Sequence, residues 1–164
     1  MSKLKIETGS SPAEARFSIT VTEKGPFLVY GRPPLAEQFI MPNERNESWY
    51  FQEGRHFSTE AEPTALCRCG ASKRKPYCDG THETAAWNPE LTAPDESLLN
   101  AAETIEGEAL TMTDNPKYCV FARFCHPQGD AWTLTEQSED PEARQLAIRE
   151  ASMCPSGRLM AWNR

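Results

Sequence analysis

The residues best suited to chemistry form one dense segment, CRCGASKRKPYCDGTH, at residues 67–82. It holds three of the six cysteines and one of the three histidines in this chain of 164 residues. Thiolate sulfur and imidazole nitrogen are common ligands of zinc and of iron in proteins. The composition of this segment therefore indicates a bound metal.

The spacing, C-x-C-x8-C-x3-H, groups the donors in two pairs. In an extended chain residues i and i+2 point to the same side, so Cys67 and Cys69 can direct two sulfurs at one metal. Cys78 and His82 are four residues apart and share one face of a helical turn. Two pairs suit either one tetrahedral zinc or the two irons of a [2Fe-2S] cluster. The single-residue gap favours iron, because ligand pairs of structural zinc are usually more widely spaced, but zinc or no metal stays open.

The segment resembles the CDGSH iron-sulfur family. The signature of that family is C-x-C, a Ser or Thr three residues later, a proline, and then C-D-G-x-H. Ser72, Pro76 and residues 78–82 match it, with threonine where the family name has serine. Upstream, residues 25–31 (GPFLVYG) look like the early strand of the family, so the resemblance covers residues 16–88.

The resemblance implies that Cys67, Cys69, Cys78 and His82 ligate the iron of a [2Fe-2S] cluster in a small β-rich domain. It also implies a homodimer, because single-motif members of the family exchange strands between protomers. A neutral imidazole in place of a thiolate makes the site less negative, which should raise its reduction potential. Protonation of His82 competes with iron binding, so we expect faster cluster loss in acid.

The other three cysteines, Cys119, Cys125 and Cys154, form a second candidate site. In bacterial-type ferredoxins the run is C-x2-C-x2-C with a distant C-P, and here Ala122 stands in place of the middle cysteine. Residues 154–159 (CPSGRL) resemble the end of divergent single-cluster ferredoxin-like domains. The resemblance implies a [3Fe-4S] cluster, for which three cysteines suffice.

The same cysteines have a simpler interpretation, as small buried hydrophobic groups of a domain that binds no cluster. His126 follows Cys125 directly, but adjacent side chains point in different directions, so we do not expect it to be a ligand. The large apolar residues nearby are expected in the core, namely Trp132, Met153, Met160 and Trp162.

The pattern around both sites predicts an α+β protein with two small domains. We expect a polar leader over residues 1–15, a β-rich CDGSH domain over 16–88, a linker over 89–107 and a ferredoxin-like domain over 108–164. In the first domain, alternating apolar residues predict strands at 17–21 and 27–29 around a Lys-Gly-Pro turn. Short apolar pieces follow at residues 38–41 and 49–51.

In the second half the expected elements are less regular. An acidic stretch predicts a short helix over residues 95–102, inside the linker. Strands are predicted at 109–113 and 132–135, and Asp114 is a candidate cap for a turn that leads to Cys119. Asp140 and the proline after it open a helix that delivers Cys154.

Composition and charge restrict the function. The formal net charge is −7, all of it in the half that begins at Pro89, which argues against nucleic acid and could guide docking to a basic redox partner. There is no apolar run of about 20 residues and no signal-peptide core at the start, so we expect a cytoplasmic protein without a membrane segment. Thiols stay reduced in that compartment, which favours metal ligands over disulfides.

No catalytic arrangement of nucleophile and base is visible, and no nucleotide-binding loop, so we do not expect an enzyme. The leading hypothesis is a one-electron carrier. The alternatives are an iron-sulfur storage, transfer or sensing module, a structural zinc module, and an electron-delivery subunit of an enzyme.

Overall fold

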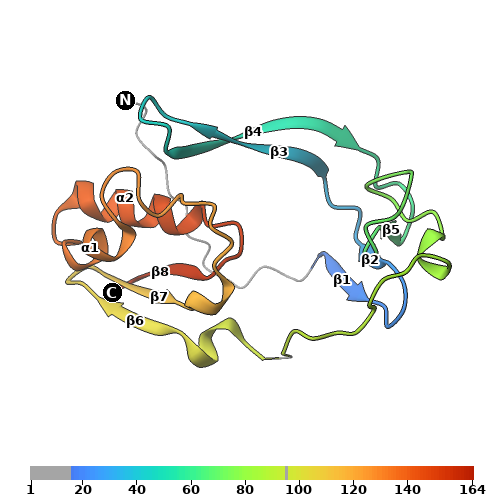
Figure 1. The fold of residues 1–164 in the computed structure, drawn as a ribbon. Helices are drawn as coiled ribbons and strands as arrows, with labels where there is room; N and C mark the ends of the chain where they lie inside the picture. Colours follow the sequence, from blue (N-terminus) through green and yellow to red (C-terminus); the bar gives the residue numbers. More distant parts are fainter. Residues whose placement is uncertain (1–15, 95) are drawn as a thin grey trace. The chain divides into compact units, whose positions relative to one another are not determined.

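The fold is mixed α+β, which confirms the predicted class. The computed structural model describes residues 16–94 and 96–164, and the polar leader expected over residues 1–15 lies outside them. The described part contains eight strands, two α-helices and short 3₁₀ turns (Figure 1). Among these residues no helix combines the length and the apolar character that crossing a membrane requires.

The described residues divide into two compact units that are interleaved in the sequence. Residues 16–37 and 54–94 form what we call the N-terminal unit. Residues 38–53 group instead with residues 96–164, and together these form the C-terminal unit. A segment of the first half of the chain is thus part of the second unit.

The N-terminal unit is built on a three-stranded antiparallel sheet in the order β1-β2-β5. Its strands are Ser18–Val21, Phe27–Tyr30 and Thr64–Leu66. The first two confirm the predicted pair, since they meet around a turn in which the N–H of Thr22 donates to the carbonyl of Pro26. Val29, in the central strand, is buried at 7% exposure between Ile19 and Thr64. The sheet places the end of β5 directly before Cys67.

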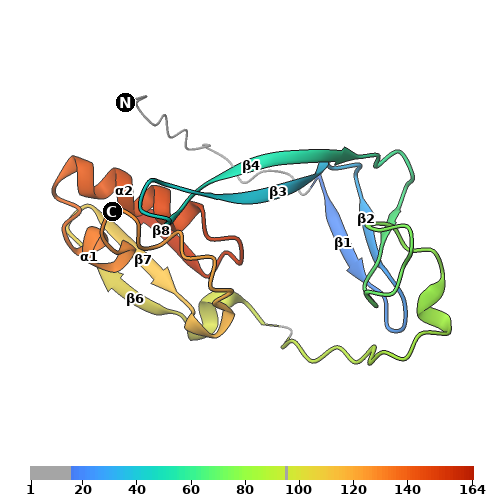
Figure 2. The same cartoon turned by 45° about the horizontal axis from the view of Figure 1, so that its top comes forward.

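The apolar pieces at residues 38–41 and 49–51 lie in a long hairpin. Strand β3 is Leu35–Pro42 and β4 is Ser48–Phe57, and the two form an extended ribbon (Figure 2). At its tip Asn43 holds the turn, because its side-chain oxygen accepts the N–H groups of Arg45 and Glu47. The polar run between the apolar pieces is therefore the hairpin turn.

The C-terminal unit has its own antiparallel sheet, in the order β6-β7-β8. The strands are Glu103–Glu106, Leu110–Asp114 and Leu159–Asn163. The predicted strand at 109–113 is confirmed by β7. Strand β6 corrects the expected linker over 89–107: β-branched Thr104 and Ile105 suit an edge strand, and Ile105 packs on the core. Upstream, the 3₁₀ turn Leu98–Ala101 lies where a helix was expected over residues 95–102, of which residue 95 is outside the described part of the chain.

Two helices cover one face of this sheet (Figures 1 and 2). Helix α2, Pro141–Ser152, confirms the helix predicted from Asp140, whose side chain accepts the N–H of Ala143. Helix α1, Ala131–Glu136, corrects the strand predicted at 132–135. There Asp130 caps the helix by accepting the N–H of Thr133, a local signal that outweighs the β-branched composition.

Two further expectations about this unit are wrong. Asp114 caps no turn, because Asn115 occupies the N-cap of the 3₁₀ turn Pro116–Tyr118 and Asp114 ends β7, buried at 3% exposure. Trp162 is not in the core but 44% exposed, at the outer end of β8. The core itself consists of Leu110, Met112, Ala131, Leu134, Ala143, Ala147, Ala151 and Leu159.

Candidate metal centres

The first motif folds as a loop that returns along β5. The N–H of Cys67 donates to the carbonyl of Pro76 at 2.8 Å, and the N–H of Cys78 donates to the carbonyl of Ala65 at 2.9 Å. Leu66 and the residue before Cys78 form an antiparallel bridge. These backbone bonds bring the two ends of the motif to the same end of the strand.

Within the motif the four predicted ligands form two close pairs. The sulfurs of Cys67 and Cys69 lie 3.8 Å apart. The sulfur of Cys78 lies 3.3 Å from Nδ1 of His82, which belongs to the 3₁₀ turn Thr81–Glu83. All four side chains are half-buried. The grouping expected from the spacing is present, while iron binding by these four residues stays a prediction.

The two pairs do not merge into one mononuclear site. Within residues 16–94 and 96–164, no three Cys, His, Asp or Glu side chains lie close enough together to hold a single metal ion. A structural zinc needs all four donors around one ion. A [2Fe-2S] cluster needs two protein ligands on each of two irons. The two donor pairs have the composition that such a cluster requires, two protein ligands for each iron.

The sulfur of Cys67 is in an environment that favours metal binding. Hydrogen bonding from the backbone of Ser72 lowers the pKa of Cys67, and partial burial opposes this only in part. Cys69 accepts a hydrogen bond from the N–H of Ala71 at 3.4 Å. Because the thiolate is the metal ligand, backbone N–H groups directed at the sulfurs support that role.

Asp79 connects the two halves of the motif. Its carboxylate accepts the N–H of Thr81 at 3.0 Å, at the start of the 3₁₀ turn, and the N–H of Lys73 at 2.9 Å, in the basic loop. Hydrogen bonding from Thr81 and then from Lys73 holds the pKa of Asp79 well below its usual range. Asp79 therefore stays ionised as a clamp between the loop and the turn that carries His82.

Arg68, between the first two cysteines, is a positioning residue that sequence reasoning missed. Its guanidinium donates to four backbone carbonyls at 3.0 to 3.1 Å, those of Thr22, Glu23, Gly25 and Pro89. These bonds tie the Cys67–Cys69 pair to the turn after β1 and to the segment after the motif. Its position between two ligands was the available signal, but the sequence does not show what the side chain reaches.

Trp87 links this anchor to the second pair of ligands. Its ring lies under the guanidinium of Arg68, with 4.6 Å from the guanidinium carbon to the ring centroid. Its indole N–H donates to the carbonyl of His82 at 3.0 Å. The contact between Arg68 and Trp87 thus fixes the two ligand pairs relative to each other, although Trp87 lies five residues beyond the motif.

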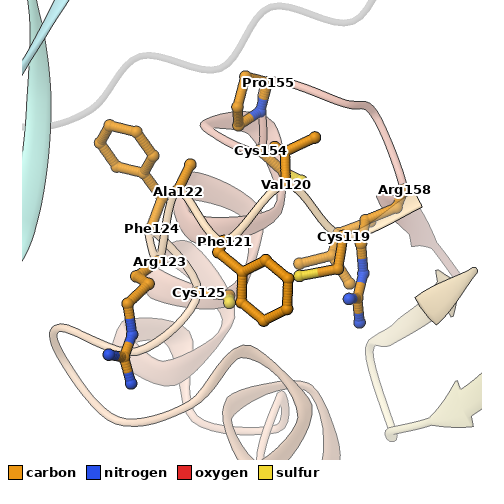
Figure 3. Close-up of a pocket in the computed structure, with 11 residues that line it drawn as sticks. Cys119, Val120, Phe121, Ala122, Arg123, Phe124, Cys125, Cys154, Pro155 and Arg158 are labelled. Carbon is orange, nitrogen blue, oxygen red and sulfur yellow. The ribbon is translucent and has the colours of Figure 1, made fainter. Parts of the chain in front are cut away.

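The second three cysteines line one pocket of the C-terminal unit (Figure 3). Cys119 and Cys125 lie in the connection between β7 and α1, and Cys154 follows α2. The empty space, including its solvent-open part, is about 300 Å³. In clusters of three or four irons each cysteine binds a different iron, so their sulfurs need not reach one common ion. Three cysteine sulfurs around one pocket are the kind of donor set that such a cluster takes.

The loop between Cys119 and Cys125 has an unusual backbone. Phe121 and Arg123 have φ of +56° and +62°, a left-handed conformation that non-glycine residues seldom adopt. Ala122, in place of a cysteine, lies between them and lines the pocket. Phe121 is also 82% exposed. A strained backbone persists where the surroundings require it, and such strain concentrates at functional sites.

The position of Cys125 depends on its neighbour Phe124. That ring is 1% exposed and packs on Phe51 of β4, with 4.6 Å between centroids. Burial raises the pKa of Cys125. The hairpin segment of the C-terminal unit therefore supports the cysteine loop, which no local sequence pattern indicates.

A buried ion pair lies beside the same pocket. Nε and Nη2 of Arg158 donate to the two carboxylate oxygens of Asp114 at 2.6 and 2.5 Å. Burial disfavours the charge of Arg158, but hydrogen bonds to Asp114 and to the side chain of Cys119 outweigh this and raise the pKa of Arg158. Arg158 is next to Cys119 in Figure 3. A fixed positive charge thus faces the second cysteine site.

The other two histidines are His126 and His56. The ring of His126 lies against Trp132, 5.7 Å between centroids, and is not among the residues that line the cysteine pocket. His56 lies in β4, away from the ligand motif in the sequence.

Comparison with known proteins identifies both segments. Residues 24–83 match the family model described as an iron-binding zinc finger of CDGSH type. Residues 105–164 match the family model described as a divergent 4Fe-4S mono-cluster. Neither the curated proteins nor the solved structures contain a match. The chain therefore combines a domain of the CDGSH family with a domain of the divergent 4Fe-4S mono-cluster family.

Proposed function

We propose that this protein is a one-electron carrier with two iron-sulfur clusters. In this proposal Cys67, Cys69, Cys78 and His82 hold a [2Fe-2S] cluster. The observation that carries it is the separation of these donors into a Cys–Cys pair at 3.8 Å and a Cys–His pair at 3.3 Å, with no described three-donor site for a single ion. Such a cluster, when bound, accepts and releases one electron at a time.

The protein's own residues account for how the site is held. Arg68 and Trp87 fix the spacing of the two pairs, and Asp79 holds the turn that presents Nδ1 of His82. All four side chains are only half-buried, which leaves the centre near the surface. Electron transfer between proteins requires such proximity.

For the second site we propose a cluster held by Cys119, Cys125 and Cys154. The pocket that they share and the family match to residues 105–164 support it. Three protein ligands suit a [3Fe-4S] cluster, or a [4Fe-4S] cluster with one iron lacking a cysteine. Docking of the acidic C-terminal half on a basic redox partner, and a homodimer, stay predictions.

Iron, acid-labile sulfide and zinc per chain test the proposal on anaerobically purified protein. About two irons with two sulfides means that only the first site is filled. About five irons with six sulfides adds a [3Fe-4S] cluster, and about six of each adds a [4Fe-4S] cluster. Zinc without iron in fresh protein would overturn the electron-carrier function.

One observation favours a second function, storage or transfer of the first cluster. The Cys–His pair is only half-buried, and an imidazole ligand is released more readily than a thiolate when it is protonated. A carrier keeps its cluster through repeated reduction and oxidation. A transfer protein passes it intact to an apo-acceptor, such as an apo-ferredoxin, as visible spectra of the separated proteins would show.

The His82→Cys variant tests the role of the imidazole. We expect a lower reduction potential, because a thiolate adds negative charge to the site, and slower cluster loss at about pH 5.5. Potential is measured by voltammetry and loss by the decay of visible absorption. The same substitution at His56, outside the motif, is the control. Equal acid decay in His82→Cys and the wild type would show that His82 is not a ligand.

A further inference from the structure

The second site lacks one cysteine of the ferredoxin pattern, and the structure places a charge beside it. Ala122 occupies the position of the missing ligand. Among the residues that line the pocket, the charged ones are Arg123 and Arg158, although the C-terminal half of the chain is acidic. Of these two, Arg158 is held in place by Asp114 and Trp132.

The guanidinium of Arg158 is held in a single orientation. Its two bonds to Asp114 are bidentate, the pair that leaves an Arg side chain least freedom. Asp114 is fixed in turn, because Trp132 donates its indole N–H to the same carboxylate at 2.9 Å. The ring of Trp132 also lies 5.9 Å from the guanidinium carbon of Arg158. The side chains of Arg158 and Asp114 are only 11% and 4% exposed.

A buried pair of this kind needs an explanation other than stability. Taking two charges out of water costs about as much as their attraction returns, so apolar residues would fill the same space at least as well. Arg158, however, lines the same pocket as Cys119, Cys125 and Cys154, and it lies beside Cys119 (Figure 3). Asp114 has its carboxylate directed at Arg158, so the positive end of the pair faces the cysteines.

We propose that Arg158, oriented by Asp114 and Trp132, is the residue that sets the reduction potential of the cluster held by Cys119, Cys125 and Cys154. This rests on the proposed function of that site. Reduction adds one negative charge to a cluster, and a nearby fixed positive charge in a medium of low dielectric favours the reduced form. Arg158 is a positioning residue in this role, since it acts through the cysteine sulfur and is no ligand itself.

The test is a redox titration of the full chain followed by electron paramagnetic resonance, which separates two clusters by their signals. In Arg158→Gln we expect the equilibrium constant for reduction of the second cluster to fall about tenfold, which lowers its reduction potential by about 59 mV for one electron. Arg158→Lys keeps the positive charge but loses the bidentate guanidinium. Its reduction potential for the second cluster should lie between those of Arg158→Gln and the wild type. The first cluster provides an internal reference that should not move.

Arg164→Gln is the matched control. Arg164 follows the same strand at its other end and also pairs with a carboxylate, Glu106, at 3.0 Å, but that pair is more than half exposed. Because Arg158→Gln leaves Asp114 buried without its partner and could disturb folding, the double variant Asp114→Asn with Arg158→Gln is measured too. It removes both charges, and its potential should still lie below the wild type, since Arg158 is the charge nearer Cys119.

The outcomes separate the two proposals. Wild-type protein with only about two irons per chain removes the second cluster, and both proposals for that site with it. Full iron content with equal potentials in the wild type, Arg158→Gln and the double variant overturns the role of Arg158 alone. A shift of equal size in Arg164→Gln would also overturn it, because the effect would then be one of net charge.

Discussion

Replacing Glu150 with glutamine is expected to stabilise the C-terminal unit by about 2 kcal/mol at pH 8 and to have little effect at pH 5. Glu150 lies in α2 with an exposed fraction of 0%. One of its carboxylate oxygens accepts the N–H of Gln128 at 3.1 Å, while the other has no hydrogen-bond partner in the described part of the chain. A buried carboxyl with an unpaired oxygen is costly when it is ionised.

The electrostatic surroundings give the direction of the effect. Burial raises the pKa of Glu150 to about 7, and the nearby carboxylates of Asp130 and Glu47 add to this, while the Gln128 N–H and the charge of Arg149 oppose it. A carboxyl whose pKa is higher in the folded than in the unfolded state stabilises the fold at low pH. That contribution is lost as the pH rises from the unfolded value of about 4.5 through 7. Neutral glutamine removes this loss.

The magnitude follows from linkage. Each unit of pKa corresponds to about 1.4 kcal/mol, so the ionised carboxyl costs about 3 kcal/mol above pH 7. The amide of glutamine would have no acceptor at the unpaired position, which reduces the expected stabilisation by about 1 kcal/mol. Denaturant unfolding at both pH values measures the difference, with Glu139→Gln, an exposed residue before α2, as control. An equal change at pH 5 and pH 8 would contradict the assignment of the pH dependence to Glu150.

Replacing Arg68 with methionine is expected to shorten the half-life of the first cluster at least about tenfold, because it costs about 3 kcal/mol or more in anchoring. Methionine keeps much of the apolar stem but donates no hydrogen bond to the four carbonyls that Arg68 reaches. The ring of Trp87 also loses the guanidinium packed on it. The two ligand pairs then lose the contact that fixes their separation.

The measurement is the decay of visible absorption at neutral pH, with circular dichroism to show that the sheet remains folded. Arg74→Met is the control, since Arg74 is an exposed arginine of the same motif and its loss changes the net charge equally. Trp87→Phe should have a smaller effect than Arg68→Met, because phenylalanine keeps a ring but cannot donate to the carbonyl of His82. Equal half-lives for Arg68→Met and Arg74→Met would show that Arg68 does not anchor the site.

Features determined by neighbouring residues could be predicted from the sequence. The sulfur pair of Cys67 and Cys69 follows from i, i+2 spacing, and the pair of Cys78 and His82 from one turn. The strands around the turn at Gly25 and the helix after Asp140 carry their own alternation and cap. Both family resemblances depended on contiguous motifs, which is why they could be read from the chain alone.

Features determined by distant residues could not. Helix α1 is six residues long, too short for its periodicity to outweigh a strand-like composition, and only the cap at Asp130 marks it. Strand β6 is a short edge strand with a glutamate at each end, and its acidic sequence is typical of a linker. The partners of Arg68 lie up to 46 residues away, and Arg158 and Asp114 are separated by 44. A sequence pattern shows that such a residue is charged but not which group receives its hydrogen bonds.

The interleaved hairpin has a consequence for how the two family segments can be handled. Residues 38–53 lie inside the stretch that matches the CDGSH family, yet they belong to the compact unit of the other family. Phe51 packs on Phe124, and the carbonyl of Trp49 accepts a hydrogen bond from Arg149, one hundred residues later. During synthesis this hairpin is made early, but its packing partners Phe124 and Arg149 are made only near the end of the chain. Cutting the chain after residue 88 would leave a C-terminal fragment with an uncovered aromatic surface, so the two segments are not interchangeable modules.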